Sequence, residues 1–161
     1  MQHAKDFQRR IIETLAPGTK RFPRGCVLLM DMGTGKTFVS IQVIMQRLTE
    51  GKRVLVVVPA TKVLDWKEEF LKWTDLEEDD IHIVDRHSKM DTGRIWVGSY
   101  SMVTKMVPGR FRWTHIILDE SQSIKDRESQ QASMLIPVLK KAEYVLLLTG
   151  TIAPNAPWEM Y

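Results

Sequence analysis

The chain has 161 residues, of which 43% are hydrophobic and 27% charged, and its formal net charge is +3. This length and apolar content suit a single domain with its own core and exclude a disordered tail. A lone cysteine, Cys26, excludes a disulfide framework and indicates a reducing compartment, and no stretch approaches the roughly 18 consecutive apolar residues of a membrane helix. We therefore expect a soluble protein without membrane contact, located in the cytoplasm, in the nucleus of a eukaryote, or in the host cytoplasm of a virus.

Charge is unevenly distributed along the chain. Residues 1–53 contain ten lysines and arginines against four acidic residues, whereas residues 65–80 contain eight acidic residues against two basic ones. The basic half favours contact with a polyanion, and the acidic stretch 75–80 is typical of a solvated loop.

The first predicted helix spans residues 6–15. Its apolar side chains recur at helical spacing, and a Pro-Gly pair at 17–18 ends the helix. The resulting stripe consists of Phe7, Ile11, Ile12 and Leu15. Gln8 lies on the first turn, where by itself it is typical of an exposed helix residue.

Residues 26–37, CVLLMDMGTGKT, predict a buried strand, a phosphate-binding loop and the start of a helix. Backbone N–H groups around Gly33 and Gly35 can surround an anion, and the helix N-terminus adds its positive dipole end. Lys36 is placed to reach the β and γ phosphates of a nucleotide, and the Thr37 hydroxyl suits Mg²⁺. Met30 replaces the first glycine of the usual GxxxxGK[ST] pattern, so a plain glycine turn before a helix is the alternative.

Two further strand–helix units follow. The run Val54–Val58 has no polar alternation, which indicates a strand buried on both faces of a parallel sheet. A helix over about 62–73 places aromatic and aliphatic side chains at helical spacing, and these are more typical of a core than of nucleic-acid stacking: Val63, Trp66, Phe70 and Trp73. Residues 81–84 and 95–100 predict strands, and a short helix extends to about Val107.

The last part of the chain predicts two more strands. The apolar start of HIILDESQ, residues 115–122, reads as a strand that ends in two carboxylates, Asp119 and Glu120. A helix rich in serine and glutamine then extends to about Leu135, with Pro137 closing or kinking it. Residues 144–148 form the final strand and lead into a Thr-Gly-Thr turn.

This alternation predicts a doubly wound α/β domain, with a mostly parallel sheet between helices and its sites at the carboxyl ends of the strands. A Mg²⁺·ATP site needs a second acidic group for the metal and a group that orients the attacking water, and Asp119 and Glu120 suit these roles. The turn Thr149-Gly150-Thr151 is predicted to hydrogen-bond the acidic loop and respond to the γ-phosphate; its alternative is a simple end to a strand.

Six motifs occur in a fixed order from about residue 6 to the end of the chain: FQRRI, MDMGTGKT, VVVPATKVLDWKEEF, VGSYSMV, ILDESQSIKDRES and LLLTGT. Together they resemble the first RecA-like lobe of the Swi/Snf-related ATPases in helicase superfamily two. The resemblance implies a RecA-like P-loop NTPase fold, one lobe over residues 1–161, ATP and Mg²⁺ as cofactors, and double-stranded or branched DNA rather than RNA as partner.

The resemblance also implies roles for individual residues. Gln8 corresponds to the adenine-reading glutamine, and Asp119 with Glu120 to the Walker B pair. The phosphate and metal residues are Gly33, Thr34, Gly35, Lys36 and Thr37. Those implied to couple ATP to nucleic acid are Gln122, Thr149, Gly150 and Thr151. The predicted nucleic-acid residues are Lys62, Trp66, Tyr100, Arg110 and Arg112. Ile124-Lys125 matches the Ile-Lys pair that follows the acidic box in this family more than in DEAD-box RNA helicases, which favours DNA over RNA as the partner. Gln122 departs from the family pattern, because a histidine is frequent at that position in the wider superfamily.

Members of this family close two lobes over ATP, and the second lobe supplies arginines to the γ-phosphate. No second-lobe motif occurs in this sequence, and an arginine finger is worth about a thousandfold or more in rate, so we expect little hydrolysis without a second lobe from elsewhere. The alternative is a stand-alone DNA-binding module on the same fold without ATP turnover, using Arg9, Arg10, Lys20, Arg21, Arg24, Arg110 and Arg112. A metabolic kinase is a weaker third reading, because no acceptor pocket can be identified.

Overall fold

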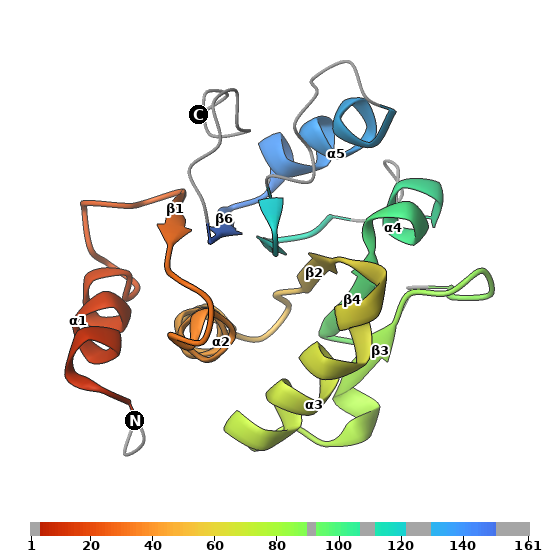
Figure 1. The fold of residues 1–161 in the computed structure, drawn as a ribbon. Coiled ribbons are helices and arrows are strands. Elements are labelled where there is room, and N and C mark those ends of the chain that lie inside the picture. The colour runs from red at the N-terminus through yellow and green to blue at the C-terminus, as the bar shows by residue number, and fades with distance from the viewer. Residues whose placement is uncertain (1–3, 90–92, 107–111, 122–129, 151–161) are drawn as a thin grey trace.

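The computed structural model describes residues 4–89, 93–106, 112–121 and 130–150, which form a sheet between two layers of helices (Figure 1). In chain order the elements are α1 (Asp6–Thr14), β1 (Gly25–Leu29), α2 (Lys36–Arg47), β2 (Val54–Val58), a 3₁₀ turn (Ala60–Lys62), α3 (Val63–Trp73), a second 3₁₀ turn (Glu78–Asp80), β3 (Ile81–Ile83), β4 (Ile95–Ser99), α4 (Tyr100–Met106), β5 (His115–Leu118), α5 (Gln130–Lys141) and β6 (Tyr144–Thr149). The predicted alternation of strands and helices, and with it the α/β class, is confirmed. No helix among these residues is long and apolar enough to cross a membrane.

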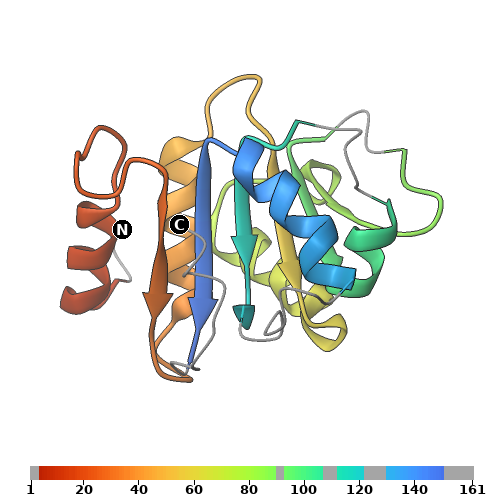
Figure 2. The same ribbon diagram turned by 90° about the horizontal axis from the view of Figure 1, so that it is seen from above.

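The described strands form one six-stranded sheet in the order β1-β6-β5-β2-β4-β3, and every pairing in it is parallel (Figure 2). Parallel pairing brings the carboxyl ends of all the strands to the same edge. The residues directly after β1, β2, β5 and β6 therefore lie on one side of the molecule, where ligand sites of doubly wound folds lie.

The two faces of the sheet carry separate apolar cores. Alternate residues of β2 point to opposite faces, because side chains alternate along a strand: Val54, Val56 and Val58 join one core, and Leu55 and Val57 join the other. All five β2 side chains are fully buried, as the continuous apolar run predicts.

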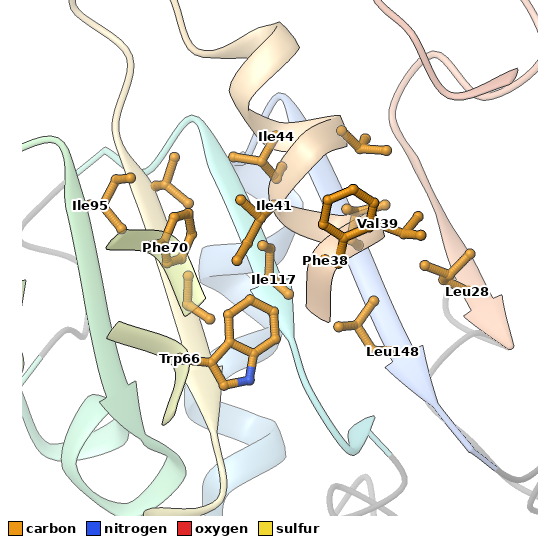
Figure 3. Close-up of a cluster of buried hydrophobic side chains, with 14 of the residues drawn as sticks. Leu28, Phe38, Val39, Ile41, Ile44, Trp66, Phe70, Ile95, Ile117 and Leu148 are labelled. Atoms are coloured by element: carbon orange, nitrogen blue, oxygen red, sulfur yellow. The ribbon is translucent and has the colours of Figure 1, made fainter. Parts of the chain in front are cut away.

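Helices α1, α2 and α3 contribute to the first core, and α4 and α5 contribute to the second. Figure 3 shows the first core, where Ile41 and Ile44 of α2 face Phe70 of α3 above the sheet. Phe38 and Trp73 join these two helices through an edge-to-face ring contact with centroids 4.9 Å apart. The predicted core role of the α3 aromatics is confirmed for the buried Trp66 and Phe70.

Two predictions about individual elements were wrong. The strand before the phosphate loop is not buried on both faces: β1 is an edge strand, with Val27 36% and Leu29 48% exposed, because it pairs with β6 alone. Helix α5 does not end at Leu135 but continues to Lys141 with Pro137 inside it. Pro137 lies on the exposed side, and burial of Leu135 and Leu139 in the second core offsets the lost backbone hydrogen bond.

Candidate nucleotide-binding site

A cavity of about 550 Å³ lies at the carboxyl edge of the sheet. It is formed by the start of α1, the loop between β1 and α2, the first turns of α3, and the residues that follow β5. Most of the predicted site residues line it: Gln8, Gly33, Thr34, Gly35, Lys36, Thr37, Lys62, Trp66, Asp119 and Glu120. The topology therefore gathers residues from four separate segments, as the strand-end argument predicts.

The loop before α2 has the backbone conformation of an anion-binding turn. Gly33 and Gly35 have φ values of +74° and +88°, which L side chains rarely adopt. Gly35 is the N-cap of α2 and Lys36 its first residue, so the positive end of the helix dipole faces the cavity. The Thr34 hydroxyl donates a hydrogen bond to the Asp31 carbonyl at 2.6 Å and closes the loop on itself.

Lys36 is the most informative residue of the site. Its side chain is 11% exposed, and its buried Nζ makes no hydrogen bond within the described part of the chain. The carboxylate oxygen Oε1 of Glu120 lies 3.9 Å away, and a Cβ at Gly150 would lie only 3.2 Å from the ammonium. A buried charge without hydrogen bonds costs free energy, so this ammonium fits a site whose missing partner is an anion.

The acidic pair follows β5, where the chain turns sharply. Asp119 is 8% exposed, and burial raises the pKa of its carboxyl, a shift that the Trp66 hydrogen bond opposes. Glu120 has a φ of +50°, a strained value for a residue with a side chain, and its N–H donates to Asp119 Oδ1 at 3.0 Å. This turn directs both carboxylates toward the cavity that Lys36 lines.

Two residues predicted to face nucleic acid lie inside the domain. Trp66 is 2% exposed, and its indole Nε1–H donates to Asp119 Oδ2 at 2.9 Å. Tyr100 is 6% exposed, and its hydroxyl donates to the Asp119 backbone carbonyl at 2.7 Å. Burial raises the pKa of Tyr100, so its hydroxyl stays protonated and remains a donor. Neither ring is presented to solvent, because each fills a core and satisfies its polar atom on Asp119.

Gln8 joins α1 to the phosphate loop. Its Nε2 donates to the Thr34 carbonyl at 2.8 Å, and its Oε1 accepts from the Lys5 backbone N–H at 2.9 Å. A Cβ at Gly35 would approach Nε2 to 2.4 Å and displace this amide, and the φ of +88° at Gly35 itself favours glycine. Each amide atom of Gln8 still has one further hydrogen-bonding position, which leaves it able to bind a base that enters the cavity.

The end of β6 reaches the acidic loop through a residue that sequence reasoning missed. Ser121 is fully buried, and its hydroxyl donates to the Leu148 carbonyl at 3.1 Å. The carbonyl of the buried Thr149 accepts from the Met30 N–H at 3.2 Å and ties β6 to the start of the phosphate loop. Ser121 stands next to the Asp-Glu pair in the sequence, but only the pairing of β5 with β6 brings it to Leu148.

The predicted nucleic-acid residues do not form one surface. Lys62 is exposed at the rim of the cavity and pairs with Asp65 at 2.8 Å. Arg112 is also exposed, but it precedes β5 and pairs with Glu143 at 3.8 Å, at the edge of the sheet opposite the cavity. Arg110, Gln122, Thr151 and the Ile124-Lys125 pair lie outside the described residues.

The donor set fits a magnesium ion that is shared with a nucleotide. Thr37 and Asp119 offer a hydroxyl and a carboxylate on the same cavity, and both are oxygen ligands of the kind that Mg²⁺ prefers. Within the described residues no group of three or more His, Cys, Asp or Glu side chains is placed to hold a metal.

Comparison with known sequences identifies relatives over most of the chain. The model of the SNF2-related domain matches residues 7–161. The human "DNA annealing helicase and endonuclease ZRANB3" is 30% identical over 146 residues, a match that covers 84% of this chain and 13% of the human protein. The "SWI/SNF-related matrix-associated actin-dependent regulator of chromatin subfamily A-like protein 1" of Bos taurus is 32% identical over 142 residues, covering 86% of this chain and 15% of that protein.

Solved structures share the fold. The Sulfolobus solfataricus SWI2/SNF2 ATPase core in complex with dsDNA superposes with a TM-score of 0.74 and 23% identity, covering 91% of this chain and 31% of that one. The Pyrococcus furiosus Hef helicase domain superposes with a TM-score of 0.78 and 18% identity, covering 98% of this chain and 34% of that one. These likenesses confirm the predicted RecA-like fold. The chain spans only a small part of the length of the curated relatives it matches.

The family match and the fold agree with the order of the motifs in the sequence. Two of these motifs, the phosphate loop and the acidic pair, line the same cavity. The chain therefore belongs to the SNF2-related domain family, the N-terminal ATPase lobe of SWI2/SNF2 helicase-like ATPases.

Proposed function

We propose that this chain is the ATP-binding lobe of a DNA-dependent ATPase or translocase. The observation that supports this most strongly is the buried Lys36 ammonium, which makes no hydrogen bond within the described residues and lines a cavity with the phosphate loop and Asp119. The phosphates of a nucleotide would supply the missing acceptors. A purely structural lysine gains nothing from such burial, because a solvated ammonium avoids the desolvation cost.

Each group around the cavity has a role that suits its chemistry. The N–H groups of the Gly33–Lys36 loop and the Lys36 ammonium bind phosphate oxygens, and Gln8 binds the adenine edge. Thr37 and Asp119 hold Mg²⁺, which neutralises charge on the phosphates when it is bound. Glu120 orients the attacking water, and Thr149 and Gly150 lie where the acidic loop and Lys36 meet the end of β6. Catalysis of this kind depends on position and charge rather than on a covalent nucleophile.

Turnover is expected to need more than this lobe. Among the described residues that line the cavity, Lys36 is the buried cation near the proposed phosphate position, and none is an arginine. Because an arginine finger contributes about a thousandfold or more to phosphoryl transfer, we expect slow hydrolysis until a second RecA-like lobe supplies one. That lobe would come from another chain or from further sequence of the same protein.

Duplex or branched DNA is the proposed partner. One structural relative is described as a complex with dsDNA, and one sequence relative as a DNA annealing helicase. Lys62 stands exposed at the rim of the cavity, where a phosphate backbone can reach it. The alternative, a DNA-binding module without turnover, makes Lys36 dispensable, and the desolvation cost of its buried ammonium would then be offset by no bound ligand.

The test combines binding with turnover. Calorimetry with a non-hydrolysable ATP analogue and Mg²⁺ should show one binding event in the wild-type chain and none in Lys36→Ala. The matched control is Lys52→Ala, which removes an ammonium paired with Glu143 at the amino ends of the strands, away from the cavity. ATP hydrolysis should rise when duplex DNA and a second RecA-like lobe from a relative are added, and Glu120→Gln should abolish that rise while binding persists.

The opposite results would support the rival reading. If Lys36→Ala bound DNA and performed the cellular task as well as the wild type, and if neither DNA nor an added lobe stimulated hydrolysis, the chain would be a DNA-binding module. Loss of binding in Lys52→Ala as well would indicate a general effect on the fold rather than a nucleotide site.

A further inference from the structure

Asp119 is held by hydrogen bonds at every polar group it has. Its N–H donates to the Val57 carbonyl at 2.9 Å, and its carbonyl accepts from the Tyr100 hydroxyl at 2.7 Å. On the carboxylate, Oδ2 accepts from Trp66 Nε1 at 2.9 Å and Oδ1 accepts from the Glu120 N–H at 3.0 Å. Both the backbone and the side chain are therefore fixed before any ligand enters.

The two aromatic donors come from opposite faces of the sheet. Trp66 lies on α3, which follows β2, and belongs to the core under α1, α2 and α3. Tyr100 begins α4, which follows β4, and belongs to the core under α4 and α5. Strands β5, β2 and β4 are neighbours in the sheet, so the end of β5 lies within reach of both side chains.

The arrangement leaves Asp119 able to bind a further group. A carboxylate has about four acceptor positions, and the hydrogen bonds from Trp66 and Glu120 use one on each oxygen. Trp66 and Asp119 both line the cavity that Lys36 lines. Hydrogen bonds that orient a ligating carboxylate typically change metal affinity by about 10–100-fold when they are removed.

We propose that Trp66 and Tyr100 are positioning residues for the metal-binding carboxylate: Trp66 fixes the side chain of Asp119 from one face of the sheet, and Tyr100 fixes its backbone from the other. This inference rests on the proposed Mg²⁺·ATP site. It assigns both aromatics a role in the nucleotide site, in place of the direct nucleic-acid contact predicted from the sequence.

A role limited to core packing makes a different prediction. Phenylalanine keeps the ring of Tyr100, and at position 66 it replaces the indole with a smaller aromatic ring. Both changes retain much of the buried apolar area and remove the hydrogen-bond donor. If packing were the whole role, Trp66→Phe and Tyr100→Phe would lower stability and leave the Mg²⁺ dependence of nucleotide binding unchanged. The chain offers matched controls in Trp113→Phe and Tyr144→Phe, since both residues are 1% exposed and both lie at the opposite edge of the sheet.

The experiment measures the affinity of the full chain for adenosine 5′-(β,γ-imido)triphosphate by calorimetry, in EDTA and over a series of Mg²⁺ concentrations. We expect Trp66→Phe to keep its affinity in EDTA but to need about tenfold or more Mg²⁺ for the same gain in affinity. Tyr100→Phe should change in the same direction, and the two controls should follow the wild type.

A second readout follows the hydrogen bond directly. The indole N–H resonance that disappears in Trp66→Phe should shift when Mg²⁺ is added to the nucleotide-bound wild-type chain, whereas the resonance that disappears in Trp113→Phe should not. If the wild type depends on Mg²⁺ and both phenylalanine variants depend on it equally, the inference is overturned while the proposed function stands. A wild-type chain without any Mg²⁺-dependent binding would overturn both.

Discussion

Lys36 and Asp119 bring opposite charges into the same cavity, but they differ in how their charged groups are hydrogen-bonded. The Lys36 ammonium is buried without a hydrogen bond among the described residues, whereas Asp119 is buried with a donor on each carboxylate oxygen. Both arrangements cost folding free energy that a bound phosphate or metal would offset. The strained Glu120 backbone also costs folding free energy, so three costly arrangements lie at the cavity where the chemistry is proposed.

A buried histidine far from the cavity provides a test at the level of one residue. His115 is 4% exposed at the start of β5, and burial lowers its pKa from 6.5 to about 4. The unfolded chain takes up this proton near pH 6.5 and the folded chain only near pH 4, so the unfolded state binds more protons in between. Stability should therefore fall by about 3 kcal/mol from this group as the pH drops from 6.5 to 4.

Urea unfolding at several pH values checks this expectation. The wild type carries other titrating groups, so the informative quantity is the difference from His115→Gln, which cannot take up the proton. The unfolding free energy of the wild type minus that of the variant should fall by about 3 kcal/mol as the pH drops from 6.5 to 4. Parallel curves would mean that His115 titrates alike in both states.

At the level of elements, the edge strand β1 connects the sheet to the phosphate loop of the site. It pairs with β6 alone, yet it leads directly into the phosphate loop. Its first residue, Gly25, has a φ of +134°, and a Cβ there would lie 1.9 Å from the Val145 carbonyl oxygen. No side chain fits between the two strands at this point, and the overlap involves backbone that cannot rotate away.

We therefore expect Gly25→Ala to lower the free energy of unfolding by about 2–4 kcal/mol and to weaken nucleotide binding, because moving β1 moves the loop. Gly51→Ala is the matched control: its φ is also positive, at +74°, but its Cβ would meet nothing within 4 Å. That variant should lose only about 1 kcal/mol from backbone strain and bind nucleotide normally. Equal losses in the two variants, measured by chemical denaturation and calorimetry, would contradict the steric argument.

At the level of the whole molecule, the cavity lies between segments that are distant in the sheet order. The phosphate loop follows the edge strand β1, Asp119 follows β5, and Lys62 and Trp66 follow β2. A ligand bound to all of them links one edge of the sheet to its centre. Binding should therefore stabilise the whole domain rather than order one loop.

A non-hydrolysable ATP analogue with Mg²⁺ at about 100 times its dissociation constant should add about 2.7 kcal/mol of stability. For a chain of this size that corresponds to a rise in melting temperature of about 5–10 °C. Scanning calorimetry of the wild type and Lys36→Ala provides the check, and the variant should show no rise. A similar rise in both proteins would place the ligand somewhere other than this cavity.

Local patterns in the sequence determined the class of fold, the phosphate loop, the Asp119-Glu120 pair and the family. These features depend on residues close together in the chain, such as the Gly35-Lys36-Thr37 run or the apolar run before Asp119, so their physical meaning can be read without knowing what packs where. The mainly local character of these signals explains why the predicted fold is confirmed.

Tertiary structure alone decided which strand lies at the edge and what the buried aromatics bind. Trp66 and Tyr100 are 53 and 19 residues away from Asp119 in sequence, and their hydrogen bonds exist only because β2, β4 and β5 are neighbours. The same strand order leaves β1 half exposed. The parallel direction of the strands places Arg112, which precedes β5, at the end of the sheet opposite the cavity. Pairing between distant segments leaves no periodic signal in the sequence, because burial depends on which elements meet and a hydrogen bond depends on where its acceptor comes to lie.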